Sequence, residues 1–359
     1  MAVQTVRDDR QGDEAAGTRD RLLALVGNFR KRTVLVIGDL IADEFIYGEV
    51  ARVSREAPVL ILKYDTTEIL PGGAGNAARN VAALGGRAAI VGVVGTDLEG
   101  RRLLGSFPRQ VDRRQVVRLT PYRTPVKTRI LAGGTHSAKQ QVVRIDREPG
   151  WPMRDTVRRA VVDRASAALD RADAVVLSDY GSGLITPALA RKIVQRLRAR
   201  GRCVPVLLDS RYRLLDYRGL TTCTPNESEV EHALGITIGD DRATLERAGR
   251  AVLERTRSRA VLVTRGSRGM ALFEPDRETL HIPIFGSDEV ADVTGAGDTV
   301  IATFGLALAA GASFGDAARV ANYAGGIVVM KRGTATVSAE EMTAAIASGS
   351  PRPTPGATI

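Results

Sequence analysis

The chain has 359 residues, a formal net charge of +10 and 44% hydrophobic residues, which is enough apolar material for one large α/β domain. No apolar run reaches the roughly 18 residues that a membrane helix needs, and residues 1–20 are polar, so we expect a cytoplasmic protein with no membrane partner. The basic residues are spread along the chain without interleaved aromatics, which argues against nucleic acid and leaves the charge to steer anionic small molecules.

Strand and helix signals alternate along most of the chain. We expect a disordered leader at 1–17, one domain at 18–347, and a flexible tail at 348–359, which contains three prolines. The expected strands are 33–37, 88–94, 174–178, 204–208, 220–223 and 259–264, and the expected helices are 18–29, 75–84, 153–169, 186–199 and 226–234. This alternation predicts a doubly wound α/β fold, with a mainly parallel central sheet and helices on both faces.

Two extended stretches interrupt the alternation, at about 44–69 and 115–145. Both are rich in Val, Ile, Thr and Tyr and lack helical periodicity. We expect them to pair as a small β-lid that closes over a substrate and excludes water. A dimerisation clasp is the alternative, and one sheet can serve both purposes. An unpaired lid edge would favour a homodimer.

Cysteine and histidine give no sign of a metal or redox site. Cys203 and Cys223 have neither zinc spacing nor a disulfide framework, and we expect both to be buried beside strands. The three histidines are scattered without partners at ligand spacing. Catalysis must therefore depend on carboxylates and backbone groups. Lysine is scarce, with six among the 51 basic residues, which draws attention to Lys127 and Lys331.

The most informative segment is Asp-Val-Thr-Gly-Ala-Gly-Asp at 292–298, which precedes an apolar helical run. The backbone amides of Gly295, Ala296 and Gly297 can point at negative charge, and the helix dipole adds its positive end. Asp298 would be repelled by a transferring phosphoryl group, so its plausible task is to take a proton from an attacking hydroxyl. The segment indicates a kinase, although Gly-Ala-Gly also serves close helix packing.

A second glycine-rich segment, Pro-Gly-Gly-Ala-Gly-Asn at 71–76, precedes another expected helix. Gly72 and Gly73 allow the backbone to approach a ligand closely, and Asn76 offers a donor and an acceptor to a polyol. An ordinary turn with a helix cap is the alternative for this segment alone. The two segments together favour sugar phosphorylation.

Both segments resemble the two signatures of the ribokinase or PfkB family of carbohydrate kinases, over roughly residues 33–340. The resemblance implies a ribokinase-like fold, ATP and Mg²⁺ as cofactors, and Asp298 as the catalytic base beside an anion hole at 295–297. It also implies that Asn226 and Glu229, in Thr-Pro-Asn-Glu-Ser-Glu, shape the magnesium site through water. The remaining nucleotide contacts that it implies are Thr264, Arg265, Gly266, Gly269 and Lys331. Without the resemblance, 263–270 would be a hairpin turn.

A narrower resemblance is to the heptose-7-phosphate kinase branch of this family. It is carried by segments in the lid, the cleft and the C-terminal part, at 38–43, 47–48, 52–59, 143–146, 177–180, 298–301 and 331–338. It implies phosphorylation of heptose 7-phosphate at O1 to the 1,7-bisphosphate, a precursor of ADP-heptose. The residues expected to hold the sugar or sugar phosphate are Asp43, Gly72, Gly73, Asn76, Arg52, Lys127, Arg129 and Arg144. For each lid arginine, a solvated surface position is the alternative.

Three positions depart from that branch. Ser182 stands where the branch tends to have lysine, Arg211 also replaces a lysine, and Glu44 stands where arginine is common. Arg211 keeps a positive charge, whereas Ser182 cannot. These departures leave open a kinase for another sugar or sugar acid, or a regulator that binds without turnover. Bifunctional members add a domain with a His-x-Gly-His motif, which this sequence lacks, so we expect a separate nucleotidyltransferase in the pathway.

Overall fold

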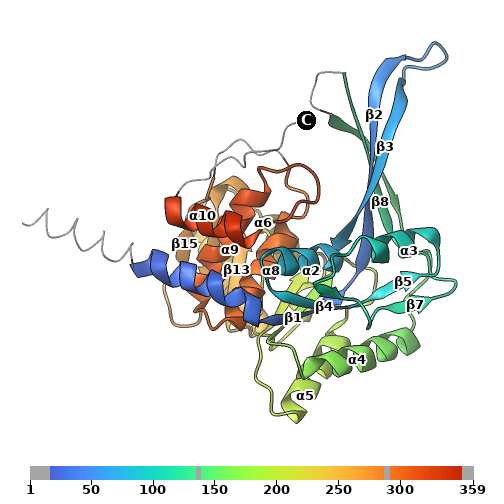
Figure 1. The fold of residues 1–359 in the computed structure, drawn as a ribbon. Coiled ribbons are helices and arrows are strands. Elements are labelled where there is room, and N and C mark those ends of the chain that lie inside the picture. The colour runs from blue at the N-terminus through green and yellow to red at the C-terminus, as the bar shows by residue number, and fades with distance from the viewer. Residues whose placement is uncertain (1–16, 135–138, 287–291, 350–359) are drawn as a thin grey trace, which may run out of the picture.

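The computed structural model describes residues 17–134, 139–286 and 292–349. The expected leader, apart from Gly17, and the expected tail beyond Gly349 lie outside the described residues. A nine-stranded central sheet divides the molecule into layers (Figure 1). Its strands, in spatial order, are β15 (Leu280–Ile282), β14 (Met270–Phe273), β13 (Ala260–Thr264), β12 (Thr222–Cys223), β11 (Val206–Ser210), β10 (Ala174–Asp179), β1 (Thr33–Gly38), β4 (Arg87–Val91) and β6 (Val111–Asp112).

Neighbouring strands from β13 to β6 are parallel, and only β14 and β15 run antiparallel at one edge. Alternating side chains of each strand enter two separate hydrophobic cores. On β1, Val34 and Val36 face one core, while Leu35 and Ile37 face the other. Because both faces of the strand are buried, its sequence is continuously apolar instead of alternating. This confirms the predicted fold class.

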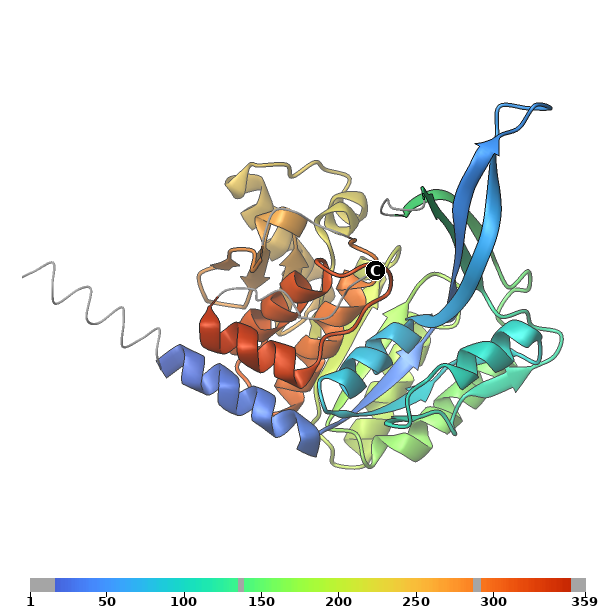
Figure 2. The same ribbon diagram turned by 45° about the horizontal axis from the view of Figure 1, so that its top comes forward.

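Helices cover both faces of the sheet, as Figures 1 and 2 show. The first core contains residues from helix 17–28 and from α2 (Ala74–Ala83), α8 (Ala296–Ala309), α9 (Phe314–Val328) and α10 (Ala339–Ser348). The second contains residues from α4 (Asp155–Leu169), α5 (Pro187–Ala199), α6 (Glu227–Leu234) and α7 (Arg242–Thr256). Among the described helices, none is long and apolar enough to cross a membrane.

Several helices begin where side chains satisfy the first free amides. Thr186 caps α5, with Pro187 as its first residue, and Ser338 forms a reciprocal capping box with Glu341 at the start of α10. Such caps each contribute about 1 kcal/mol. The described part of the chain also contains three short 3₁₀ helices, Phe29–Lys31, Leu214–Asp216 and Gly266–Arg268.

The lid is a separate four-stranded sheet that projects from the body (Figures 1 and 2). Its strands, in spatial order, are β3 (Leu60–Gly73), β2 (Leu40–Val53), β8 (Val126–Gly133) and β9 (Gln140–Arg147). β2 pairs with β3 antiparallel and with β8 parallel. The first lid strand begins at Leu40, two residues after β1 ends, so the lid root lies beside the central sheet.

The structure corrects several expected boundaries. The strand expected at 88–94 is divided at Gly92 into β4 and β5 (Val93–Gly95), and β5 pairs with β7 (Val117–Leu119) outside both larger sheets. A side chain at Gly92 would collide with the Gly38 carbonyl, 2.6 Å from an ideal Cβ. Only the later part of 115–145 therefore belongs to the lid. The sequence reading also missed α3 (Leu98–Gly105), α7 and the short β6.

The two cysteines have different environments. Cys223 is buried on β12, as expected, but Cys203 is exposed in the connection between α5 and β11, so the expectation that both are buried was wrong. Burial raises the pKa of Cys223 to about 12, which keeps it a neutral thiol.

Candidate active site

The carboxyl ends of β1 and β10 form the floor of the candidate site. β1 lies between β10 and β4: after β1 the chain forms β4 and β6 on one side of it, and later returns to form β10 on the other side. Ligands of doubly wound sheets bind in the crevice where the strand order reverses in this way. Asp39 follows β1 and Asp179 ends β10, and both carboxylates are buried. The sheet therefore places polar groups where a ligand is expected.

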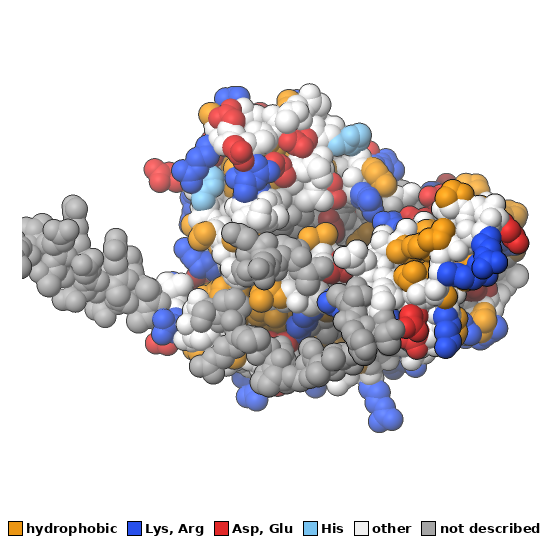
Figure 3. Space-filling model, turned by 90° about the horizontal axis from the view of Figure 1, so that it is seen from above, with side chains coloured by type: hydrophobic (Ala, Val, Ile, Leu, Met, Phe, Trp, Pro, Cys, Tyr) orange, Lys and Arg blue, Asp and Glu red, His pale blue; other side chains and the backbone are white. Residues whose placement is uncertain are grey.

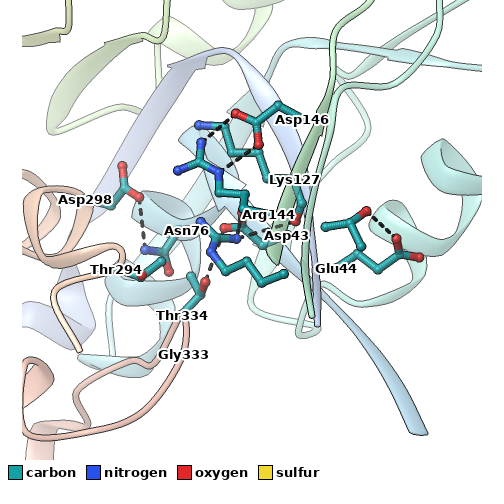
Figure 4. A network of polar contacts seen from close by, with 12 residues as sticks. Asp43, Glu44, Asn76, Lys127, Arg144, Asp146, Thr294, Asp298, Gly333 and Thr334 are labelled. Atoms are coloured by element: carbon teal, nitrogen blue, oxygen red, sulfur yellow. Dashed lines mark hydrogen bonds and ion pairs between the residues drawn. The ribbon is translucent and has the colours of Figure 1, made fainter. Parts of the chain in front are cut away.

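Helix α8 approaches this edge with its first turn, and Asp298 is its third residue. Gly295 precedes the helix with φ of 79°, a left-handed conformation that favours glycine, and an ideal Cβ there would lie 2.5 Å from Asn76 Nδ2. Asp298 is only 3% exposed. Its Oδ2 accepts a hydrogen bond from Asn76 Nδ2 at 3.0 Å (Figure 4). Its Oδ1 accepts one from the Tyr180 hydroxyl at 2.9 Å.

The environment of Asp298 suits proton transfer near neutral pH. The pKa of Asp298 is raised to about 7, chiefly by burial and also by the nearby Asp43 carboxylate, against the lowering effects of Asn76, Tyr180 and Lys127. A general base works best when its pKa lies near the operating pH. Asp298 therefore has the protonation behaviour expected of a base that accepts a hydroxyl proton.

The three backbone amides expected to form an anion hole differ in their surroundings. The Ala296 amide donates to the Val293 carbonyl at 3.2 Å, which closes the turn before the helix. Gly297 is exposed, and an ideal Cβ on it would meet no atom within 4 Å. There is therefore open space beside Gly297 in the first turn of α8, where the positive end of the helix dipole favours a phosphate group.

The second glycine-rich segment supports the same site. Gly73 caps α2 with φ of 58°, and an ideal Cβ on Gly72 would lie 2.3 Å from Asp43 Oδ2. Asn76 is fully buried in the first turn of α2, and its Oδ1 also accepts from Asn80 Nδ2 at 3.2 Å. These contacts fix Asn76 in the orientation that donates to Asp298.

Charged side chains on one face of the lid lie over this floor. Strand register places Asp43 opposite Lys127, and Lys127 opposite Asp146, so the three share one face of the sheet. The next row on this face contains Arg129 and Arg144, which are paired across β8 and β9. Figure 4 shows Asp43, Lys127, Asp146 and Arg144 of this group beside Asn76 and Asp298.

The lid root contains a buried ion pair. Arg129 donates to Asp43 Oδ1 at 2.7 Å, and both side chains are nearly inaccessible to solvent. The other oxygen of Asp43 accepts from the Thr334 hydroxyl at 3.2 Å, which joins the lid to the C-terminal part of the chain. Lys127 lies over the Tyr180 ring, with its Nζ 5.0 Å from the ring centre. Burial lowers the pKa of Lys127.

Two of the four expected lid cations are less closely engaged. Arg144 is exposed and forms two hydrogen bonds to the Asp146 carboxylate, each 2.7 Å long. Arg52 is exposed in the distal part of β2. The structure therefore brings Lys127 and Arg129 to the root beside Asp298, leaves Arg144 at the rim, and places Arg52 towards the tip.

The expected nucleotide residues surround the ends of β12 and β13. Asn226 and Glu229 form a reciprocal capping box at the start of α6, through bonds of 2.8 and 2.9 Å. An isolated bridge pairs Asn226 with Thr264 at the end of β13. Among the described residues, no three acidic, histidine or cysteine side chains converge as a metal site. The donor set fits Mg²⁺ held through water more readily than a direct cage.

The other expected nucleotide residues have structural contacts of their own. Arg265 donates to Glu227 at 2.7 Å, and Lys331 donates to Glu341 at the start of α10, also at 2.7 Å. Gly266 and Gly269 lie in the turn between the antiparallel strands β13 and β14, which is the hairpin expected from sequence. An ideal Cβ on Gly269 would lie 2.1 Å from the Ile282 carbonyl, so close packing already requires this glycine.

Sequence reasoning did not assign a role to three residues that contact or face the site. Tyr180 bonds Asp298, Thr334 bonds Asp43, and Asp209 is a half-buried carboxyl group near both Asp298 and Glu229. Burial, followed by the Glu229 and Asp298 charges, raises the pKa of Asp209 well above its usual value. Their positions at the ends of β10 and β11 and after α9 could have indicated that they lie near the site. Spacing along the chain does not, however, reveal which residues they contact.

The fold and this arrangement define a kinase of the ribokinase-like class. The model of the pfkB family carbohydrate kinase matches residues 31–342, and the chain belongs to that family. It is therefore a carbohydrate kinase, and family membership implies the use of ATP. Among solved structures, ribokinase from Arabidopsis thaliana, complexed with ribose and ATP, is 21% identical and covers 88% of this chain and 98% of its own, with a TM-score of 0.65. Ribokinase from Giardia lamblia is 19% identical, with a TM-score of 0.69 and coverage of 89% and 99%.

Curated relatives are more similar in sequence. Bifunctional protein HldE of Geobacter sulfurreducens is 43% identical over 310 residues, which cover 86% of this chain and 61% of the relative. The protein of the same name from Caulobacter vibrioides is 42% identical over 337 residues, covering 93% and 67%. The chain thus spans about three fifths to two thirds of the length of these relatives.

Proposed function

We propose that this kinase transfers the terminal phosphoryl group of ATP to O1 of heptose 7-phosphate, giving the 1,7-bisphosphate used in ADP-heptose synthesis. The observation that carries the chemistry is the buried Asp298, which is oriented by Asn76 and Tyr180 in front of the lid cation Lys127. The heptose assignment is supported by the motifs of the heptose-7-phosphate kinase branch and by the relatives named bifunctional protein HldE.

In the proposed reaction, Asp298 accepts the proton of the sugar O1 hydroxyl. The O1 oxygen forms a bond to the terminal phosphorus while the bond from that phosphorus to the bridging oxygen breaks, and ADP leaves. The positive end of α8 at Gly297 stabilises charge on the phosphoryl oxygens, and the lid root orients the sugar through Asp43 and Asn76.

Mg²⁺ bound with ATP would neutralise phosphate charge, and Glu229 would hold it through water. Asn226 fits a supporting position, because its side-chain oxygen already accepts from Ser228 and from the Glu229 amide. The Lys127 and Arg129 side chains supply positive charge on the side of the cleft formed by the lid. ADP-heptose synthesis also requires a nucleotidyltransferase activity, which the site described above does not supply.

The test is coupled ADP release from purified protein with Mg²⁺-ATP and a panel of acceptors. The panel contains heptose 7-phosphate, fructose 6-phosphate, fructose, ribose and 2-keto-3-deoxygluconate. The proposal expects heptose 7-phosphate to give the highest kcat/KM, with the new phosphate on O1 by ³¹P NMR. A preference for another sugar would overturn the heptose assignment, and ATP binding without turnover of any sugar would support a regulator instead.

We also propose that a second copy of the chain covers the outer face of the lid. Val143 and Ile145 are paired with Ile130 and Thr128, and so lie on the face opposite Lys127 and Arg129. Both are about half exposed, at 48% and 49%. Figure 3 shows apolar side chains gathered on the projecting part of the molecule. Two such faces could bury each other without covering the polar face.

Light scattering after size-exclusion chromatography tests the second copy. The proposal expects a dimer from the natural chain and a monomer from Ile145→Lys, because a buried lysine in the interface would lack a partner. Val293→Lys alters an exposed apolar residue outside the lid and serves as the matched control. A natural chain that is monomeric at micromolar concentrations would contradict the proposal.

A further inference from the structure

Tyr180 is held by its backbone before its side chain reaches the site. It follows the last residue of β10, and its amide donates to Asp39 Oδ2 at 2.8 Å. The Ser182 amide donates to the same oxygen at 3.3 Å, and the Ser182 hydroxyl donates to the other oxygen. The loop that carries Tyr180 is therefore fastened to a buried carboxylate at the end of β1.

The position of Ser182 gives one departure from the heptose branch a structural meaning. Its side chain points inward to Asp39 and not outward to the cleft. Burial raises the pKa of Asp39 to about 6, while the bonds from Ser182 and Tyr180 lower it. Ser182 thus fixes the loop in this chain without supplying charge to a substrate.

The side chain of Tyr180 has two contacts, one with the body and one with the lid sheet. Its hydroxyl donates to Asp298 Oδ1 at 2.9 Å, and the face of its ring lies under Lys127 Nζ at 5.0 Å. Asp298 belongs to α8 on the body, whereas Lys127 belongs to β8 of the lid sheet. A single aromatic side chain therefore contacts both the candidate base and a cation on the separate sheet.

The hydrogen bond from Tyr180 mainly fixes the orientation of the Asp298 carboxylate and does not transfer a proton to it. Burial and the Asp298 charge raise the pKa of Tyr180 well above its usual value, so the phenol stays protonated and donates. With Asn76 on Oδ2 and Tyr180 on Oδ1, rotation of the carboxylate would break one bond or both. Each oxygen retains lone-pair capacity for a substrate hydroxyl.

We propose that Tyr180 is a positioning residue, which orients the Asp298 carboxylate through its hydroxyl and couples it to the lid through Lys127. The inference rests on the proposed role of Asp298 as base, but not on the identity of the sugar. When the lid approaches the body, the ammonium group of Lys127 packs on the ring that holds the base. Lid position and base orientation then change together.

The first test compares Tyr180→Phe with the natural chain, using whichever sugar of the panel is phosphorylated fastest. Phenylalanine keeps the ring under Lys127 and removes only the hydroxyl. Because this variant loses a hydrogen bond to a charged group, kcat should fall by about 10- to 100-fold. The KM for ATP should change little. Lys127→Met, in contrast, should also raise the KM for an anionic sugar.

The second test measures the proton affinity of Asp298 directly and needs no turnover. Protein labelled with ¹³C at aspartate is titrated by NMR, and Asp298→Asn assigns the signal. The charged groups that face Asp298 are Asp43, Lys127 and Asp209, in addition to the phenol. Loss of a donor to the carboxylate should raise its pKa by about one unit or more in Tyr180→Phe. The acid limb of kcat/KM should move upward by the same amount.

Tyr217→Phe is the matched control, because the Tyr217 hydroxyl donates to Asp179 at 2.7 Å in a similar buried pair. It should lower Tm without moving the Asp298 titration. Lys127→Met should raise the pKa of Asp298 through loss of the direct effect of its charge. The coupling through the ring is tested by combining Lys127→Met with Tyr180→Phe, because coupled effects on the Asp298 pKa should not add. An unchanged Asp298 pKa in either folded variant would overturn the inference, whereas failure to phosphorylate heptose 7-phosphate would overturn only the sugar assignment.

Discussion

The central sheet and the lid sheet bury their side chains in different ways. Strands β1 and β10 are apolar and buried on both faces along almost their whole length. Strand β2 begins buried at Leu40 and becomes exposed towards Val53, and β9 is exposed throughout. The central sheet is therefore stabilised by burial on both faces, whereas the lid is anchored only at its root.

This difference separates two requirements of phosphoryl transfer. The proposed base, Asp298, lies on the body, where packing fixes its geometry. The cations Lys127 and Arg129 lie on the sheet that is anchored at one end, where a small movement would admit or enclose a substrate. Binding sites on a rigid element opposite a mobile one can be both precise and accessible. Variants on each side should therefore fail in different ways.

The largest effect is expected on the body side. Asp298→Asn removes the proton acceptor and should lower kcat by about 10²- to 10⁴-fold, because general base catalysis supplies roughly that factor. Steady-state kinetics with the preferred sugar measure the loss. Asp316→Asn changes an acidic residue in the first turn of α9, away from the crevice, and is the control. A fully active Asp298→Asn enzyme would remove Asp298 from the mechanism.

The next largest effect is a dependence of folding stability on pH. The pKa of Asp298 is about 7 in the folded protein and has a reference value of 3.8, so the folded state binds the proton more tightly. Stability from this group is present below about pH 4 and is lost as the pH rises through 7, by about 4 kcal/mol in total. Asp298→Asn should flatten this slope in urea unfolding from pH 4 to 8. Parallel curves for the two proteins would show that the carboxylate is not desolvated.

The lid root should be sensitive to loss of its buried cation. Arg129→Met leaves the Asp43 carboxylate buried without its ion-pair partner, which should lower the free energy of unfolding by about 3 kcal/mol. Urea unfolding at pH 7 measures the change. If Arg129→Met and Asp43→Asn together restore stability, the cost came from the unpaired charge. A change below about 1 kcal/mol in the single variant would show that solvent reaches the root.

The smallest effect is expected at the rim of the same sheet. The pair of Arg144 and Asp146 is similar in length to the pair at the root, but both side chains are exposed, at 38% and 43%. Arg144→Met should therefore change the free energy of unfolding by no more than about 0.5 kcal/mol. The same urea assay applies. Equal costs for Arg144→Met and Arg129→Met would contradict the contrast between rim and root.

Much of the central sheet could be predicted from sequence because its signals are local. Continuous apolar runs marked β1, β10 and β13, and glycine-rich turns marked the starts of α2 and α8. The break at Gly92 was missed because it depends on close approach to Gly38, a contact that periodicity does not reveal. The helix α7 was missed although its buried residues Leu245, Ala248, Val252 and Leu253 follow helical spacing.

The candidate site was predictable where residue type and spacing carry the chemistry. Asp298 and Asn76 were identified in this way, and the structure places them 3.0 Å apart although 222 residues separate them. The roles of Tyr180 and Thr334 depend on partners from other elements, so residue type and spacing could not assign them. The assignment of the nucleotide residues remains a prediction, because the structure shows Asn226 and Glu229 in a helix cap and Lys331 in an ion pair.

Because Cys203 is exposed and Cys223 is buried, movement of the lid relative to the body could be measured by fluorescence. Cys203 is exposed near the amino end of β11, whereas Cys223 is buried and its thiol stays neutral. A maleimide dye should therefore attach at Cys203 alone, at the sheet edge opposite the crevice. A second cysteine at Tyr64, which is 64% exposed on β3, would complete a donor and acceptor pair across body and lid. Energy transfer between the dyes would then follow opening and closing in single molecules without altering a residue of the proposed site.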